Sequence, residues 1–150
     1  MWVSLLMWYN LSRNINRVLP NLNLAPEHAI METILCVDDE PTQLMLLRLA
    51  LVRAGYKVLE APNGQKGVEL AVEHQPALII MDLMMPVMDG STAIWHLKQN
   101  EATKDIPILV LSAYTKGDQA KRAMDVGAAE LISKSLILTD LIDRVKNYLQ

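Results

Sequence analysis

Five short apolar runs alternate with five segments of helical pattern from residue 31 onward. The apolar runs occupy 33–37, 57–61, 77–81, 106–112 and 130–133, and the helical patterns occupy 41–55, 65–74, 91–100, 116–126 and 138–149. Apolar runs of this length, closed by polar residues, are typical of strands that are buried on both faces. Each connection is too short for anything except a direct crossover. The pattern therefore predicts an α/β fold, with one parallel sheet covered by helices on both faces.

Turn and cap residues support this division of the chain. Pro41 suits the first turn of a helix, and Gly55 suits its end. The run at 77–81 is the most apolar of the five, which predicts that it is the central strand. The pair Asp89-Gly90 predicts a tight turn before the next helix.

Composition excludes several classes of function. The 150 residues carry a formal net charge of -3, and the basic residues are scattered without a basic stripe, so nothing predicts a nucleic-acid interface. Cys36 is the single cysteine, so an internal disulfide is impossible, and its place in an apolar run predicts a buried core residue. The three histidines lack the spacing of a metal cluster.

The first thirty residues differ in composition from the rest and are interpreted as an N-terminal extension to a domain at 31–150. Their apolar part, 2–11, is too short to span a bilayer, so no membrane span is expected, and Arg13 and Arg17 follow it rather than precede it. Three interpretations stay open: a start codon assigned too early, a peripheral membrane anchor, or a helix packed on the domain. The abrupt change at Met31 favours the first.

Polar side chains follow four of the predicted strands. Asp38 and Asp39 end the first strand, Asp82 the third, Ser112 the fourth and Lys134 the fifth. Ligands of open parallel sheets bind at the carboxyl ends of the strands, beside the point where the strand order reverses. We therefore expect three carboxylates, a hydroxyl and an ammonium group to meet at one edge of the sheet.

Four motifs carry a resemblance to a known family. They are "VDDEP" at 37–41, "MDLMMPVMDG" at 81–90, "LSA" at 111–113 and "SK" at 133–134. Together they make residues 33–149 resemble the receiver domain of two-component response regulators, the CheY-like family. The resemblance implies a flavodoxin-like sheet of five parallel strands in the order 2-1-3-4-5, in a stand-alone, single-domain form.

The resemblance also implies a chemistry for this edge of the sheet. Asp82 would accept a phosphoryl group from a phosphohistidine and become an aspartyl phosphate. Mg²⁺ would be bound directly by Asp39, Asp82 and the backbone carbonyl of Met84, and mainly through water by Asp38, since carboxylates with retained waters suit this ion. Lys134 would neutralise charge on the transferring group.

The expected switch residues depart from the family pattern. The resemblance assigns Ser112 to the site as the hydroxyl that is usually coupled to an aromatic ring three residues before the lysine. Leu131 stands at the aromatic's place here, and Tyr114 is the alternative contributor. The family usually follows its lysine with a proline in a cis bond, whereas Ser135 stands here, so a trans bond is expected.

The expected function is that of a cytoplasmic response regulator in phosphorelay signal transduction. Its partners would be a histidine kinase or histidine phosphotransfer protein and a downstream protein target. It is not expected to be an enzyme, because it would catalyse only its own Mg²⁺-dependent phosphorylation and dephosphorylation. In the first helix, Leu44, Leu47 and Leu51 are assigned to the core. A second stripe of Met45, Leu49 and Val52 either docks a partner helix or belongs to a broad buried face.

Two other classes of function compete with this expectation. A receiver-like adaptor that works without phosphorylation is suggested by Leu131 and Ser135, although the complete set of acids, serine and lysine argues against it. An enzyme is disfavoured, because an aspartate-nucleophile phosphatase needs an acid where Met84 stands. A nucleotide binder needs a glycine-rich loop where the sequence reads "DDEPT".

Overall fold

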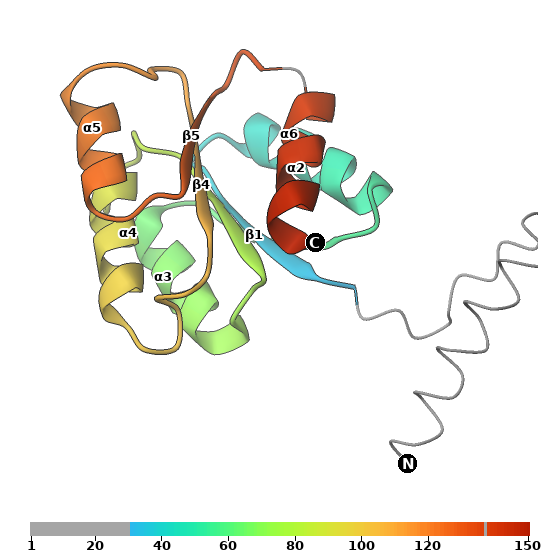
Figure 1. Ribbon diagram of the computed structural model, residues 1–150, viewed down its shortest axis with the longest axis horizontal. Helices are drawn as coiled ribbons and strands as arrows, with labels where there is room; N and C mark the ends of the chain where they lie inside the picture. Colours follow the sequence, from blue (N-terminus) through green and yellow to red (C-terminus); the bar gives the residue numbers. More distant parts are fainter. Residues whose placement is uncertain (1–30, 137) are drawn as a thin grey trace, which may run out of the picture. The chain divides into compact units, whose positions relative to one another are not determined.

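The computed structural model describes residues 31–136 and 138–150, in which five strands alternate with five helices (Figure 1). The elements are β1 (Thr33–Val37), α2 (Pro41–Arg53), β2 (Lys57–Ala61), α3 (Gly64–His74), β3 (Leu78–Met81), α4 (Gly90–Gln99), β4 (Ile108–Ser112), α5 (Asp118–Asp125), β5 (Glu130–Ser133) and α6 (Leu138–Leu149). The interpretations of residues 1–30 lie outside the described residues.

The five strands form one parallel sheet in the order β2-β1-β3-β4-β5. Both the predicted fold class and the predicted strand order are confirmed. The apolar strand β3 is central, with all four residues buried, and β1 lies between β2 and β3. The strand order therefore reverses beside β1 and β3, where a crevice for ligands is expected at the carboxyl ends.

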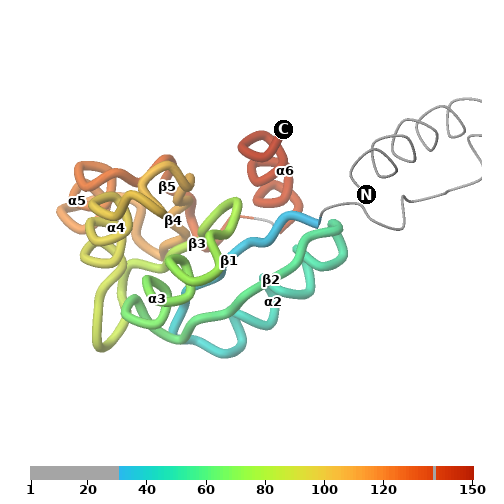
Figure 2. Tube along the Cα trace, turned by 90° about the horizontal axis from the view of Figure 1, so that it is seen from below, coloured from blue at the N-terminus to red at the C-terminus, as the bar shows by residue number. Residues whose placement is uncertain are grey.

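Two apolar layers hold helices on opposite faces of the sheet. Figures 1 and 2 show α3, α4 and α5 on one face and α2 with α6 on the other. The first layer includes Ala71, Ile94 and Ala123 from the helices, and the second includes Leu51 and Val145. Successive side chains of each strand alternate between the layers, so the inner strands β1, β3 and β4 are buried on both faces, whereas the edge strands β2 and β5 are mostly half-buried.

Helix α2 buries one stripe and exposes another. Leu47 and Leu51 are buried and Leu44 packs partly against them, which confirms the assigned core stripe. Met45, Leu49 and Val52 are exposed. The interpretation of these three residues as part of a broad buried face is therefore wrong.

Several element boundaries differ from the sequence prediction by one or two residues, and three of them have local reasons. Strand β4 begins at Ile108 rather than 106, because Pro107 has no N–H to donate to the ladder. Helix α5 begins at Asp118, after Gly117 with φ of +95°. Asp89 and Gly90 do not form a simple tight turn: Gly90 begins α4, and the Asp89 side chain caps the helix by accepting a hydrogen bond from the Thr92 N–H at 2.8 Å.

Among the described residues, no helix combines the length and the apolar character needed to cross a membrane.

Val87 occupies a backbone conformation that costs free energy. Its φ is +69°, which is rare for a β-branched residue, and its side chain is 82% exposed, so little packing compensates the strain. We expect Val87→Asn to raise the free energy of unfolding by about 1 kcal/mol, because asparagine tolerates this region better. Urea unfolding followed by circular dichroism measures the change. Val87→Ala is the matched control: it removes the same methyl groups but keeps the Cβ penalty, and an equal gain from it would contradict the strain argument.

Candidate metal centre at the carboxyl edge of the sheet

Backbone pairing places the acids of two strands side by side. Asp38 follows β1, Asp82 follows β3, and the two strands are hydrogen-bonded neighbours. The Asp82 N–H continues the ladder by donating to the Val37 carbonyl at 2.9 Å. The two carboxylates therefore leave the sheet at the same edge, one strand apart, as the sequence predicted.

Three carboxylates converge there. Asp38, Asp39 and Asp82 each offer one oxygen, and these three oxygens lie within 4.8 Å of one another. Asp38 and Asp82 are buried, whereas Asp39 is exposed at the rim. Carboxylate oxygens in this number and at this spacing are the donors that a hard divalent cation prefers.

Lys134 bridges the two buried acids. Its Nζ lies 2.8 Å from Asp38 Oδ2 and 3.3 Å from Asp82 Oδ1. Burial alone would lower the pKa of the lysine, but hydrogen bonding to Asp38 and the negative charges of Asp82 and Asp38 outweigh burial and raise the pKa. The ammonium group therefore stays protonated at neutral pH.

The centre nevertheless has an excess of negative charge. Burial is the main cause that raises the pKa of Asp82 to about 6, and the charge of Asp38 adds to it, while Lys134 and the Leu83 N–H oppose the rise. Within the described residues, Lys134 alone forms ion pairs with these acids. A bound cation would relieve the remaining repulsion, so the donor set fits a divalent metal ion.

The two oxygens of Asp82 have different surroundings. Oδ1 accepts a hydrogen bond from its neighbour's backbone, the Leu83 N–H, at 2.9 Å and also faces Lys134. Oδ2 has no hydrogen-bond donor among the described residues. Asp38 is more fully engaged, because Oδ1 accepts from the Glu40 N–H at 2.9 Å and Oδ2 pairs with the lysine. Asp82 is thus the buried acid that keeps an oxygen available.

Ser112 lies at the end of β4 and is buried. Its hydroxyl accepts a hydrogen bond from the Tyr114 N–H at 3.1 Å, and its carbonyl accepts from the Lys134 N–H at 2.8 Å. Ser112 is therefore connected both to the following loop and to the segment that bears the lysine. The Tyr114 side chain is 72% exposed, and Leu131 packs partly buried against the layer that holds α3, α4 and α5.

The segment after the lysine is held by hydroxyl groups. No cis peptide bond occurs in the described ranges, so the expected trans bond between Lys134 and Ser135 is confirmed. Ser133 Oγ accepts from the Ser135 N–H at 3.2 Å and hydrogen-bonds its hydroxyl at 2.7 Å. These bonds form a local turn directly around Lys134.

Two glycines shape the loop between Asp82 and α4, and sequence reasoning missed both roles. A Cβ on Gly90 would collide with the Asp82 carbonyl oxygen, and one on Gly64 would collide with that of Met88. Their N–H groups fasten the loop, from Gly90 to the Leu83 carbonyl at 2.9 Å and from Gly64 to the Met88 carbonyl at 3.2 Å. Close approach of two backbones depends on tertiary structure. The sequence therefore shows that glycines are present at these positions but not which backbone atoms they contact.

The methionines of this loop divide into two groups. Met85 and Met88 pack against the adjacent apolar layer, whereas Met84 is exposed at the rim of the acidic centre.

Comparison with known proteins places this arrangement in a family. The family model described as "Response regulator receiver domain" matches residues 34–146. The DNA-binding dual master transcriptional regulator RpaA of Synechocystis is 38% identical over 120 residues, which cover 80% of this chain and 50% of that protein. The polar-differentiation response regulator DivK of Brucella anthropi is 30% identical over 119 residues, which cover 79% of this chain and 96% of DivK.

A solved structure agrees with these relatives. The chemotaxis protein CheY4 of Vibrio cholerae superimposes with a TM-score of 0.74 at 27% identity, covering 79% of this chain and 98% of that one. The chain spans about half the length of several curated relatives that it matches, including RpaA.

Replacing Asp82 tests the charge balance of the centre. In the absence of divalent cations at neutral pH, we expect Asp82→Asn to raise the free energy of unfolding by about 1–3 kcal/mol, because it removes a buried carboxylate that Asp38 repels. Thermal and urea unfolding measure this gain. Mg²⁺ should stabilise the wild type more than the variant. Asp143→Asn, at an exposed site on α6, is the control and should change little. A loss of stability in Asp82→Asn would contradict the excess negative charge.

Proposed function

Because this chain belongs to the response regulator receiver domain family, we propose that it accepts a phosphoryl group on Asp82 and signals through protein contacts. The donor in this proposal is the phosphohistidine of a histidine kinase or a histidine phosphotransfer protein. Receiver domains are signalling modules rather than classical enzymes. The proposal for this chain is accordingly limited to its own phosphorylation and dephosphorylation.

The observation that carries this proposal is that only one of the two Asp82 carboxylate oxygens accepts a hydrogen bond from the described residues. Oδ1 is held by the Leu83 N–H, while Oδ2 has no donor among the described residues and belongs to a carboxylate whose pKa is raised to about 6. A fixed carboxylate with one available oxygen is suited to act as a nucleophile. Its rigid place at the end of the central strand supplies the positioning on which phosphoryl transfer depends.

In the proposed transfer, an Asp82 oxygen attacks the phosphorus of the phosphohistidine. The new O–P bond forms, and the P–N bond breaks with its electron pair returning to the imidazole. Lys134 Nζ already lies 3.3 Å from Asp82 Oδ1, so it offers positive charge and hydrogen bonds to the phosphoryl oxygens. Hydrolysis of the aspartyl phosphate by water would return the carboxylate.

Receiver domains bind Mg²⁺ at an acidic site, and the three converging carboxylates fit that ion. When bound, Mg²⁺ supplies positive charge to the phosphoryl oxygens. We assign Asp39 and Asp82 as direct ligands, together with the Met84 carbonyl. Asp38 suits a role through water, because both of its oxygens already have partners. Asp39 and Met84 lie at the exposed rim, where an ion can enter.

The exposed stripe of α2 is the proposed contact with the phosphodonor. The apolar side chains of this stripe, Met45, Leu49 and Val52, are exposed on the helix face next to the one that carries the buried leucines. A stripe with this spacing fits the apolar face of a partner helix. Helix α2 begins only two residues after Asp39, so a helix docked there would lie close to the acidic centre.

A second candidate function is a receiver-like adaptor that works without phosphorylation. The observation that favours it is the packing of Leu131, which lies partly buried in the core and offers no aromatic ring to move between two positions. In this alternative the acidic centre would contribute to stability, and the α5–β5–α6 surface would bind its target constitutively.

Intact-mass spectrometry separates the two candidates. After incubation with Mg²⁺ and acetyl phosphate, we expect the wild type to gain one phosphoryl group, because this donor needs no kinase to present it. The adduct should disappear when the metal is chelated and should be absent from Asp82→Asn, which lacks the nucleophilic oxygen.

Asp89→Asn is the matched control, since Asp89 caps α4 outside the acidic centre. It should still be labelled, and circular dichroism should show that both variants are folded. Absence of an adduct in the wild type, under conditions that label another receiver and at time points short enough to exclude rapid loss, would reject the phosphoacceptor role in favour of the adaptor.

A further inference from the structure

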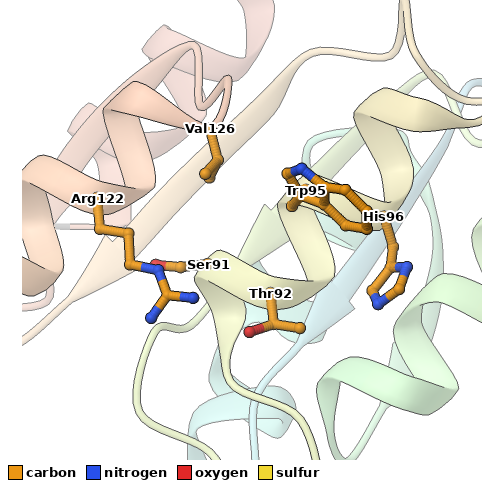
Figure 3. A pocket seen from close by; sticks show the side chains of 6 residues that line it. All are labelled: Ser91, Thr92, Trp95, His96, Arg122 and Val126. Atoms are coloured by element: carbon orange, nitrogen blue, oxygen red, sulfur yellow. The ribbon is translucent and has the colours of Figure 1, made fainter.

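A groove between α4 and α5 shares no lining residue with the acidic centre. It encloses about 300 Å³ and is lined by Ser91, Thr92, Trp95, His96, Arg122 and Val126 (Figure 3). None of these residues has a role in the proposed phosphoryl transfer. Figure 3 shows the Arg122 side chain reaching from α5 toward the first turn of α4, while the His96 ring points away from it.

The groove has a positive charge without a matching acid. Arg122 is exposed, and no carboxylate of the described chain lies within ion-pair distance of it, including Asp118 and Asp125 on its own helix. Ser91 and Thr92 belong to the first turn of α4, whose N–H groups add partial positive charge, although Asp89 already caps the Thr92 N–H. The arrangement favours a carboxylate supplied from outside.

A buried hydroxyl at the same place is unsatisfied. Ser91 is 1% exposed, and its Oγ has no hydrogen-bond partner. Leaving a buried hydroxyl unpaired costs on the order of 1–3 kcal/mol, so such groups usually have a partner. Because Ser91 lines the groove that Arg122 enters, a bound carboxylate oxygen would face both a donor hydroxyl and a guanidinium.

The other wall of the groove is apolar. Trp95 leaves 49% of its surface exposed, and its ring meets that of His96 edge-on, with centroids 5.0 Å apart and an interplanar angle of 77°. Val126 faces the same space from the end of α5. Tryptophan and arginine are both enriched among the residues that dominate protein–protein binding energy.

We propose that the α4–α5 groove binds a segment of a partner protein in which a carboxylate side chain adjoins an apolar one. The carboxylate would pair with Arg122 and Ser91, and the apolar side chain would cover Trp95. A volume of about 300 Å³ suits one or two side chains and lies at the lower limit for a small-molecule site. The proposal rests on the proposed function in one respect, which is that it regards this partner as the target of signalling. The reason is that α5 directly follows the loop that begins after Ser112 and contains Tyr114, at the same edge of the sheet as the acidic centre.

The test uses the indole N–H resonance of Trp95, in the full unphosphorylated chain. Because the chain has three tryptophans, Trp95→Phe assigns the resonance. The probe is a capped five-residue peptide with a glutamate between two leucines, and its matched control replaces the glutamate by glutamine. We expect the acidic peptide to shift the resonance saturably and to bind at least about tenfold more tightly than the control, as a charge-assisted pair predicts.

Two variants locate the interaction. Arg122→Gln should abolish the preference for glutamate, and Lys121→Gln should retain it, because Lys121 is an exposed neighbour that does not line the groove. Ser91→Ala should weaken binding of the acidic peptide relative to the glutamine peptide, because it removes the hydroxyl that donates to the carboxylate.

Several outcomes would overturn the proposal. They are equal affinity for the two peptides, no shift up to millimolar peptide, an unchanged preference in Arg122→Gln, or an equal shift with inorganic phosphate alone, which would indicate a simple anion site. A shift that depends on the concentration of the chain itself would indicate self-association instead. Since no phosphoryl group is needed, failure here leaves the mass measurement on Asp82 to decide the proposed function separately.

Discussion

The geometry of this molecule depends on one ammonium group placed between two buried carboxylates. Lys134 comes from the end of β5, at one edge of the sheet, and reaches across to Asp82 after β3 and Asp38 after β1. Without that cation, two adjacent strands would end in uncompensated charge in a poorly hydrated place. The parallel order of the strands makes the bridge possible, because it brings residues from distant parts of the chain to one edge.

The loops around this bridge are fixed by backbone contacts more than by side chains. Gly90 and Gly64 allow close contact between the segment after Asp82 and the neighbouring main chain, because they have no Cβ. The Asp89 carboxylate then caps the N-terminus of α4. Ser112 joins the same framework through hydrogen bonds to Tyr114 and to the Lys134 backbone. Rigid surroundings of this kind hold Asp82 in one orientation, with one oxygen engaged and the other available.

Most of the fold follows from the sequence, because buried strands and turn residues are local signals. All ten elements lie where the alternating pattern predicts, within two residues at their starts and ends, and the three acids and Lys134 that end the strands meet as expected. The exceptions depend on tertiary contacts. The cap made by Asp89 and the strain at Val87 require knowledge of the surrounding backbone. Two further features depend on which part of each helix is covered by its neighbours, and periodicity alone cannot define that. They are the exposure of Met45 and Leu49 and the groove lined by Trp95 and Arg122.

The bridge by Lys134 also has a consequence for the order of assembly during synthesis. Asp38 and Asp82 leave the ribosome well before residue 134, so β1, β2 and β3 can pair while their buried acids still lack the internal cation. Until β5 joins the edge of the sheet, only water or a metal ion can offset that repulsion. Nascent chains that stop short of the fifth strand therefore contain most of the sheet but lack the internal cation that partly offsets the repulsion between its buried acids.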